Sequence, residues 1–317
     1  MRALQLALTV AVTWFILDRV GLGLADLAAV EGALWVPDPV LLLAASLLLL
    51  AAYFVSAALW GLIVHELGGP RLPLGDSVRI FMIANLGRYV PGKVWQIAGL
   101  AALAKGRGVP PATAAASAVL GQGIALVAAA AVGMGALLGG PESYRRWGLV
   151  GAAGVVAAVA LLSIPAVFRR LAGAWFRLAR TEAPADLGML HGFRWLGLYA
   201  ANWVLYGLSF WVLALSLGLD GGVLPLASAF AAAYVLGYAM VFAPAGLGPR
   251  EGFLIVFLTP HVGAGPAGVV AVVSRLWTTV VELLPAGIFW LRWVGTRPPA
   301  EAGAPVAGGG AGGGKAP

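Results

Sequence analysis

Long apolar runs constrain the fold of this chain more than any other feature. They cover residues 3–24, 39–64, 112–138, 147–168, 195–217 and 267–291. An α-helix needs about 20 mostly apolar residues to cross the hydrocarbon core of a bilayer. We therefore predict an all-α polytopic membrane protein with about six full spans, the first retained as a span rather than cleaved as a signal peptide.

Composition supports this prediction and excludes several classes of protein. Hydrophobic residues make up 61% of the chain and charged residues 10%, whereas soluble domains carry about 25% charged residues. The chain has no Cys, and its three His are far apart in sequence, so we expect no metal site and no cofactor. No nucleotide-binding loop of the type GxxxxGK[ST] occurs, so direct use of ATP is not expected and the energy source stays open.

Two further apolar stretches, roughly 75–104 and 224–261, are interrupted by Pro, Gly and charged residues. The breaks read NLGRYVPGKVWQ over 85–96 and FAPAGLGPREGF over 242–253. Charges inside a bilayer are costly unless they face a bundle interior or a wet cavity. Each stretch is predicted as helix, break, helix, either as a re-entrant hairpin or as two short spans. Paired broken helices are typical of a transporter's substrate site.

The first break combines cations with a helix end. Pro91 ends the preceding helix near Tyr89, and Gly92 permits a turn. A second helix that starts near Lys93 presents free N–H groups that favour anions. Arg88 can bind a phosphate through two hydrogen bonds, while Lys93 adds a point charge. The alternative is that both cations extend to a nearby membrane interface.

The second break holds two Pro and two Gly within six residues, namely Pro244, Gly246, Gly248 and Pro249. Pro249 suits the first turn of a helix, and Glu251 suits the positive end of that helix. We predict that Arg250 and Glu251 bind substrate or form a gate. The alternative is that Glu251 only caps the helix and Arg250 pairs elsewhere.

Arg275 and Glu282 lie within the last predicted span, seven residues apart on one helix face. This separation is about 10.5 Å along the axis, too far for a direct bond. We predict pairing with the broken segments, either Arg275 with Glu251 or Glu282 with an arginine. A purely structural ion network is the alternative. Weaker polar candidates, which often only bridge helices, are Asn85, Gln96, Gln122 and Asn202.

Lys and Arg positions predict the orientation. With the N-terminus inside and both broken segments re-entrant, 13 of the 20 Lys and Arg fall in cytoplasmic segments and three in outer ones. Excess positive charge marks the cytoplasmic side. We expect both termini in the cytoplasm, and the basic pair at 145 and 146 is the one contrary signal. Because the positive charges belong to span ends, a nucleic-acid partner is not predicted.

The order of elements is similar in the two parts of the chain. Span, span, broken segment, span occurs over residues 1–140 and again, about 155 residues later, over 145–294. The two broken segments then enter from opposite sides, which predicts an inverted repeat and alternating access. Residues 1–294 are predicted to form one transmembrane domain, followed by a disordered Gly, Ala and Pro tail over 295–317.

At these motifs the chain resembles the lysylphosphatidylglycerol synthase transmembrane-region family, also called the flippase-like domain. The resemblance rests on the first motif up to Lys93 and on the second, Pro244 to Glu251, with weaker support from Ser274-Arg275-Leu276 and Leu284-Pro285-Ala286-Gly287. It implies a multi-pass inner-membrane protein of bacteria or archaea, with flipping of aminoacylated phosphatidylglycerol as the best-known activity. We expect no synthase activity, because after Trp293 only a short tail follows in place of the cytosolic acyltransferase-like domain.

The favoured hypothesis is a translocase rather than an enzyme, moving a phospholipid or polyprenyl-phosphate head group through a cationic cavity. One alternative is a membrane scaffold or partner of a separate lipid-modifying enzyme. Another is a membrane lipid-group transferase, which would want more acidic residues within the spans than Glu251 and Glu282. The lipid, its direction of movement and the oligomeric state stay open.

Overall fold

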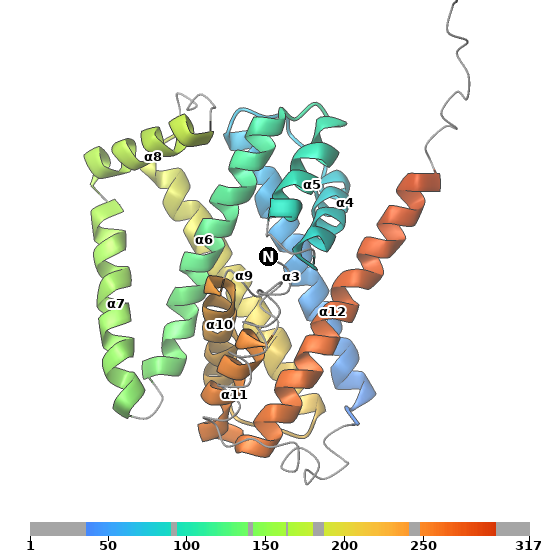
Figure 1. The fold of residues 1–317 in the computed structure, drawn as a ribbon, viewed down its shortest axis with the longest axis vertical. Helices are drawn as coiled ribbons and strands as arrows, with labels where there is room; N and C mark the ends of the chain where they lie inside the picture. The colour runs from blue at the N-terminus through green and yellow to red at the C-terminus, as the bar shows by residue number, and fades with distance from the viewer. Residues whose placement is uncertain are drawn as a thin grey trace, which may run out of the picture.

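The computed structural model describes residues 36–89, 94–138, 142–162, 164–179, 187–240 and 248–295. Within these ranges the chain is helical and has no strand, as predicted. Figure 1 shows helices α3 (Pro39–Glu66), α4 (Leu74–Asn85), α5 (Val94–Lys105), α6 (Pro111–Leu138), α7 (Glu142–Leu162), α8 (Pro165–Ala179), α9 (Met189–Ser216), α10 (Val223–Ala239), α11 (Pro249–Val262) and α12 (Ala264–Gly295). The short 3-10 helix η2 (Leu86–Tyr89) continues α4. The predicted span over 3–24 and the tail beyond Gly295 lie outside the described residues.

Four of the described helices are long and apolar enough to cross a membrane: α3, α6, α9 and the part of α12 up to Arg292. The first three have 28 residues each, or about 42 Å, more than the roughly 30 Å hydrocarbon core. Large apolar side chains such as Val40 and Leu291 point outward, 73% and 72% exposed. Such exposure suits lipid contact and is unfavourable in water. The predicted spans over 39–64, 112–138, 195–217 and 267–291 are confirmed.

The predicted span over 147–168 is not a single helix, because two helices share these residues. α7 ends at Leu162 and α8 begins at Pro165. A proline has no N–H donor and its ring clashes with the preceding helical turn, so it begins a helix more readily than it continues one. The part of α7 without charged residues, 147–162, is shorter than the predicted span. Figure 1 shows α7 at the periphery of the bundle and α8 running across its upper end.

Residues 74–105 form a helical hairpin at the upper end of the molecule (Figure 1). Its arms are antiparallel, because residues late in one arm face residues early in the other. A Cβ added to Gly99 would lie 3.4 Å from Ala84, and one added to Gly87 would lie 2.6 Å from the backbone N of Gln96. Each arm has 12 residues, about 18 Å, too short to cross a bilayer alone. The predicted break at Pro91 and Gly92, together with Lys93, lies outside the described residues.

Residues 223–262 form a second antiparallel hairpin, at the lower end (Figure 1). Gly237 on α10 packs against Arg250 on α11 near the tip, and Gly221 packs against Val262 at the base. Gly248 has φ +87°, a conformation that glycine adopts most readily, and Pro249 is the first residue of α11. Of the predicted break residues, Pro244 and Gly246 lie outside the described residues.

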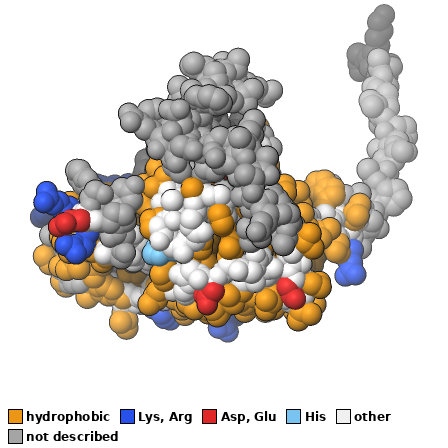
Figure 2. Space-filling view, turned by 90° about the horizontal axis from the view of Figure 1, so that it is seen from below, with side chains coloured by type: hydrophobic (Ala, Val, Ile, Leu, Met, Phe, Trp, Pro, Cys, Tyr) orange, Lys and Arg blue, Asp and Glu red, His pale blue; other side chains and the backbone are white. Residues whose placement is uncertain are grey.

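The described helix ends next to the two breaks, called the hairpin tips here, point toward each other near the middle of the bundle (Figure 1). α3 and α9 pack along each other, while α6 packs against α10 and α4 packs against α12. The order long helix, hairpin, long helix therefore occurs at α3 to α6 and again about 150 residues later at α9 to α12. From the lower end, hydrophobic side chains border a central area of other side chains and backbone (Figure 2).

Basic residues collect at the upper end, where α4 begins, α5 ends and α8 lies (Figure 1). Asp76 forms ion pairs there with Arg79 at 3.4 Å and with Arg107 at 2.7 Å. Glu66, at the end of α3, pairs with Arg194 and accepts a hydrogen bond from Trp195 at 2.5 Å. These contacts join α4 to the segment after α5, and α3 to α9.

Candidate functional site

A cavity of about 170 Å³ lies between the two hairpin tips. Each hairpin supplies part of its wall, and the long helices α3, α6, α9 and α12 supply the rest. The lining includes three arginines, one glutamate and four amide side chains: Arg88, Arg250, Arg275, Glu282, Asn85, Gln96, Gln122 and Asn202. Charged and amide groups are thus gathered on one internal surface of an otherwise apolar bundle.

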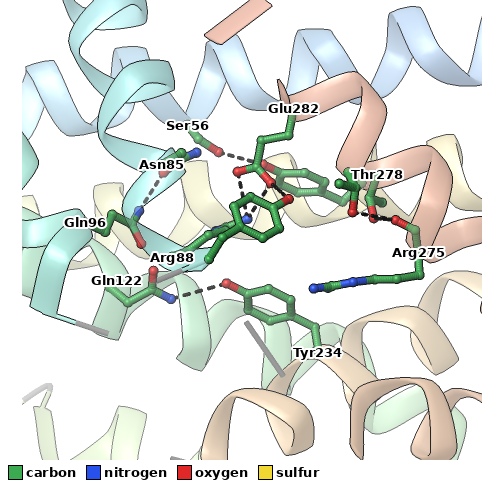
Figure 3. A network of polar contacts seen from close by, with 12 residues as sticks. Ser56, Asn85, Arg88, Gln96, Gln122, Tyr234, Arg275, Thr278 and Glu282 are labelled. Carbon is green, nitrogen blue, oxygen red and sulfur yellow. Dashed lines mark hydrogen bonds and ion pairs between the residues drawn. The ribbon is translucent and has the colours of Figure 1, made fainter. Parts of the chain in front are cut away.

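Glu282 of α12 connects with the tip of the first hairpin. Its Oε1 lies 3.0 Å from Nη1 of Arg88, and its Oε2 accepts a hydrogen bond of 2.8 Å from the hydroxyl of Tyr89. Glu282 is only 2% exposed. Figure 3 shows Arg88 pointing at this carboxylate. A carboxylate so deeply buried needs a cation and hydrogen-bond donors to stay charged, so the pair fixes the hairpin tip on α12.

Arg275, two helical turns before Glu282, connects α12 with the second hairpin. Its Nε lies 3.7 Å from Oε1 of Glu251. The other oxygen of Glu251 accepts a 2.7 Å hydrogen bond from the backbone N–H of Gly248 and caps α11. Both predicted pairings of α12 with the broken segments are therefore confirmed, and Glu251 combines its predicted cap with an ion pair.

Arg250 differs from the other two cavity arginines. It is 8% exposed, and no described carboxylate lies within ion-pair distance. Its guanidinium lies 4.9 Å from the centre of the Phe230 ring, and its Nε donates no hydrogen bond to a described residue. A cation–π contact only partly replaces lost hydration. Arg250 is therefore a buried cation with donor capacity facing the cavity.

The amide side chains hold the elements around the cavity together. Gln96 of α5 donates a 2.6 Å hydrogen bond to Asn85 of α4, across the first hairpin. Gln122 of α6 donates a 3.5 Å hydrogen bond to the hydroxyl of Tyr234 on α10 (Figure 3). These three residues, predicted as weaker polar candidates, lie in the cavity wall. Each also forms a hydrogen bond between two helices, which the alternative of a purely helix-bridging role predicts as well.

Tyrosines form a large part of the wall, and only Tyr89 among them was predicted from the sequence as a substrate-binding or gating residue. The chain has seven Tyr, and six line this cavity, namely Tyr53, Tyr89, Tyr199, Tyr206, Tyr234 and Tyr238. The spacing of some of these tyrosines in the sequence could have predicted their place in the wall. Tyr199, Asn202 and Tyr206 lie three and four residues apart on α9, so they share one helix face.

The structure thus brings Arg88, Tyr89, Arg250, Arg275 and Glu282 to one cavity, with Glu251 immediately behind Arg275. Gly248 and Pro249 begin α11 beside it. The described residues contain no group of three or more His, Asp and Glu that would hold a metal ion.

The fold and the cavity define the class: a multi-pass helical membrane protein with a polar, arginine-containing site at its centre. A family model described as the lysylphosphatidylglycerol synthase TM region matches residues 2–286. The chain belongs to this family, as its two motifs indicated. The family connects the chain with lipid modification or flipping. A comparison with curated proteins found no match.

Proposed function

We propose that this protein is a lipid translocase that moves a phospholipid or another lipid-phosphate head group across the inner membrane. The observation that carries the proposal is the cavity between two opposed hairpin tips, with Arg250 buried in its wall and without a carboxylate partner. A buried arginine whose Nε has no hydrogen-bond partner among the described residues is suited to a phosphate, which accepts two parallel hydrogen bonds from a guanidinium.

The size of the cavity supports a head group as the ligand. Its volume of about 170 Å³ is close to that of an engineered cavity of about 150 Å³ that holds one benzene ring. A phosphate with a few attached atoms fits such a volume, whereas acyl chains do not. The chains of the lipid therefore remain in the membrane while the head group occupies the site.

Alternating access follows from the hairpins and α12. One hairpin enters from each end of the bundle (Figure 1), the arrangement expected of the inverted repeat that we propose. α12 holds the first hairpin through Glu282 and the second through Arg275. Opening one ion pair while the other stays closed would connect the cavity with one side of the membrane at a time.

We further propose that the basic upper end faces the cytoplasm and that both termini lie there. The chain has no Cys, so one introduced thiol reports its own location. Arg71 and Asp220 are both exposed, near opposite ends of the bundle. We expect an impermeant thiol reagent to label Asp220→Cys but not Arg71→Cys in intact cells. The reverse pattern would invert the proposed orientation.

Leaflet-resolved transfer of labelled lipids in liposomes that contain only this purified protein tests the proposed function. We expect transfer faster than in protein-free liposomes and strong loss in Arg250→Ala. The control is Arg292→Ala, which changes an exposed arginine of α12 outside the cavity. Absence of transfer for every head group with a folded protein would favour a scaffold or partner of a separate lipid-modifying enzyme.

A further inference from the structure

Helix α8 carries three arginines that the proposed function does not use. Arg169, Arg170 and Arg177 are exposed, and none of them lines the central cavity. Arg170 and Arg177 are seven residues apart and share one face of the helix, with Arg169 at the edge of that face. Three positive charges therefore lie close together on one side of a helix of only 15 residues.

The arginines of α8 differ from three others at the upper end of the bundle. Arg79 and Arg107 pair with Asp76, and Arg194 pairs with Glu66. No carboxylate of a described residue lies within ion-pair distance of an α8 arginine. Neighbouring like charges on a helix repel one another, and an anion beside them removes that repulsion. The arginine face of α8 therefore has anion-binding capacity that the described part of the chain leaves unused.

Apolar residues of α8 hold the helix against the end of the bundle. Phe176 is 4% exposed, and together with the half-buried Trp175 it packs against the main apolar core. α8 begins just after α7 ends and runs across the upper end of the bundle, in contact with the spanning helix α6 (Figure 1). A helix that lies across the span ends, with an apolar side and a basic side, is typical of the interface between water and lipid head groups.

Below α8, the apolar helices α6 and α7 separate from each other (Figure 1). Nearer the lower end they pack closely, since a Cβ added to Gly151 of α7 would lie 3.1 Å from the sulfur of Met134 on α6. Three residues further along α7, a Cβ added to Gly154 would meet no described atom within 4 Å. Val127 lies on the same face of α6 as Met134 but seven residues nearer to the upper end, and it is 45% exposed. These facing apolar surfaces suit an acyl chain.

The basic face and the apolar surfaces below it fit one kind of molecule, an anionic phospholipid. Its phosphate accepts charge-assisted hydrogen bonds from guanidinium groups, and its net negative charge is attracted by clustered basic residues at a membrane surface. A soluble anion would satisfy the arginines but leave the facing surfaces of α6 and α7 uncovered. A lipid satisfies both.

We propose that α8 is an interfacial helix that binds an anionic phospholipid. The lipid phosphate lies on Arg169, Arg170 and Arg177, and one acyl chain lies between α6 and α7. This site is separate from the central cavity, and the lipid bound there is a partner of the outer surface and not the molecule that crosses the membrane. With the basic end facing the cytoplasm, as proposed above, the lipid belongs to the inner leaflet.

Lipid titration of the purified full chain in detergent, with bound lipid counted by native mass spectrometry, tests the proposal. We expect phosphatidylglycerol to bind more tightly than phosphatidylcholine. A basic residue near an anionic lipid surface strengthens binding about fivefold. The triple variant Arg169→Gln, Arg170→Gln and Arg177→Gln should therefore bind phosphatidylglycerol roughly 100-fold more weakly and lose the preference for it.

The matched control removes the same charge from the same end of the bundle. It is the triple variant Arg71→Gln, Lys105→Gln and Arg292→Gln, whose three side chains are exposed and lie outside both α8 and the cavity. We expect it to keep the preference of the unmodified chain. Equal losses in the two triple variants would reveal general charge attraction and overturn the site. Absence of a preference in the unmodified chain, or unchanged binding in the α8 variant, would overturn it as well.

Gly154→Leu tests the place of the acyl chain without changing any charge, so it also serves if the α8 variant does not fold. The new side chain enters the space between α6 and α7 and competes with the lipid. Phosphatidylglycerol affinity should fall roughly tenfold, the effect of a few methylene groups losing apolar contact. Gly197→Leu on α9 is the control, because an added Cβ there also meets no described atom within 4 Å. Equal affinities for the two variants would contradict the proposed position of the chain.

Discussion

Each hairpin places an arginine near its tip, Arg88 before the first break and Arg250 after the second, but the two arginines are used differently. Arg88 of the first hairpin pairs with the buried Glu282 of α12. Arg250 of the second has no carboxylate partner among the described residues, and the adjacent Glu251 instead pairs with Arg275 of α12. The polarity of the link is therefore reversed, since α12 gives an acid to one hairpin and a base to the other. One tip arginine therefore holds the fold, while the other is available to a ligand.

The largest expected effect is on stability and concerns the first hairpin. Arg88→Ala leaves the carboxylate of Glu282, 2% exposed, without its ion-pair partner. Removing one partner of a buried ion pair typically lowers the unfolding free energy by about 3–5 kcal/mol. We expect a matching decrease in unfolding free energy, measured in detergent by denaturant titration. The double variant Arg88→Ala with Glu282→Gln is expected to recover most of it, and failure to do so would show that Arg88 stabilises the tip in another way.

The second effect is on ligand binding and concerns the second hairpin. Arg250→Ala removes a charged donor that no described carboxylate needs. A hydrogen bond to a charged group contributes about 1.5–3 kcal/mol, so the affinity of the purified protein for inorganic phosphate is expected to fall roughly 10- to 150-fold. Arg250→Lys keeps the charge but not the planar fork and should be intermediate. Unchanged affinity and flux in Arg250→Ala would remove the contrast between the two arginines.

The third effect concerns how closely the second hairpin packs at its tip. A Cβ at Gly237 would lie 2.6 Å from Cβ of Arg250, so Gly237→Ala forces α10 and α11 apart. Overpacking of this kind costs about 1–3 kcal/mol, and it should also weaken phosphate binding by moving Arg250. Gly197→Ala on α9 is the matched control, because nothing lies within 4 Å of its added Cβ. Equal unfolding curves for both variants would argue against a tightly packed tip.

The smallest effect concerns the link between Arg275 and Glu251. Its atoms are 3.7 Å apart, and the two side chains are 16% and 19% exposed. An ion pair in this setting contributes about 1 kcal/mol or less. Glu251→Gln can keep the cap on Gly248, so we expect a stability loss well below that of Arg88→Ala. A loss as large as that of Arg88→Ala would mean that both hairpins are held equally firmly.

Much of the fold followed from patterns that act locally. Apolar runs such as 39–64 and 112–138 predicted helices because a backbone in lipid must satisfy its own hydrogen bonds. Pro249 and Gly248 predicted the start of α11 for steric reasons. The same local rule, applied to Pro165, would have divided the span predicted over 147–168.

The site was predicted less completely, for a physical reason. The charged site residues could be predicted because a charge inside a membrane is rare and costly, independent of the residues around it. They are Arg88, Arg250, Arg275 and Glu282. The sequence does not distinguish aromatic lining residues such as Tyr53, Tyr206 and Trp60, because aromatic residues are common in spanning helices. Only the folded structure shows that their polar groups line a cavity.

Apolar runs and the positions of charges are enough to predict that this chain lies in a membrane, where most of its helices run and which charges must be buried. Which arginine is paired, the contact of Glu251 with Arg275 and the gathering of six tyrosines around one cavity become known only from the folded chain. Burial costs and helix signals are properties of single residues and short segments. Pairing depends on the distance between side chains far apart in the sequence, 194 residues for the hydrogen bond from Arg88 to Glu282, and that distance exists only once the helices have packed.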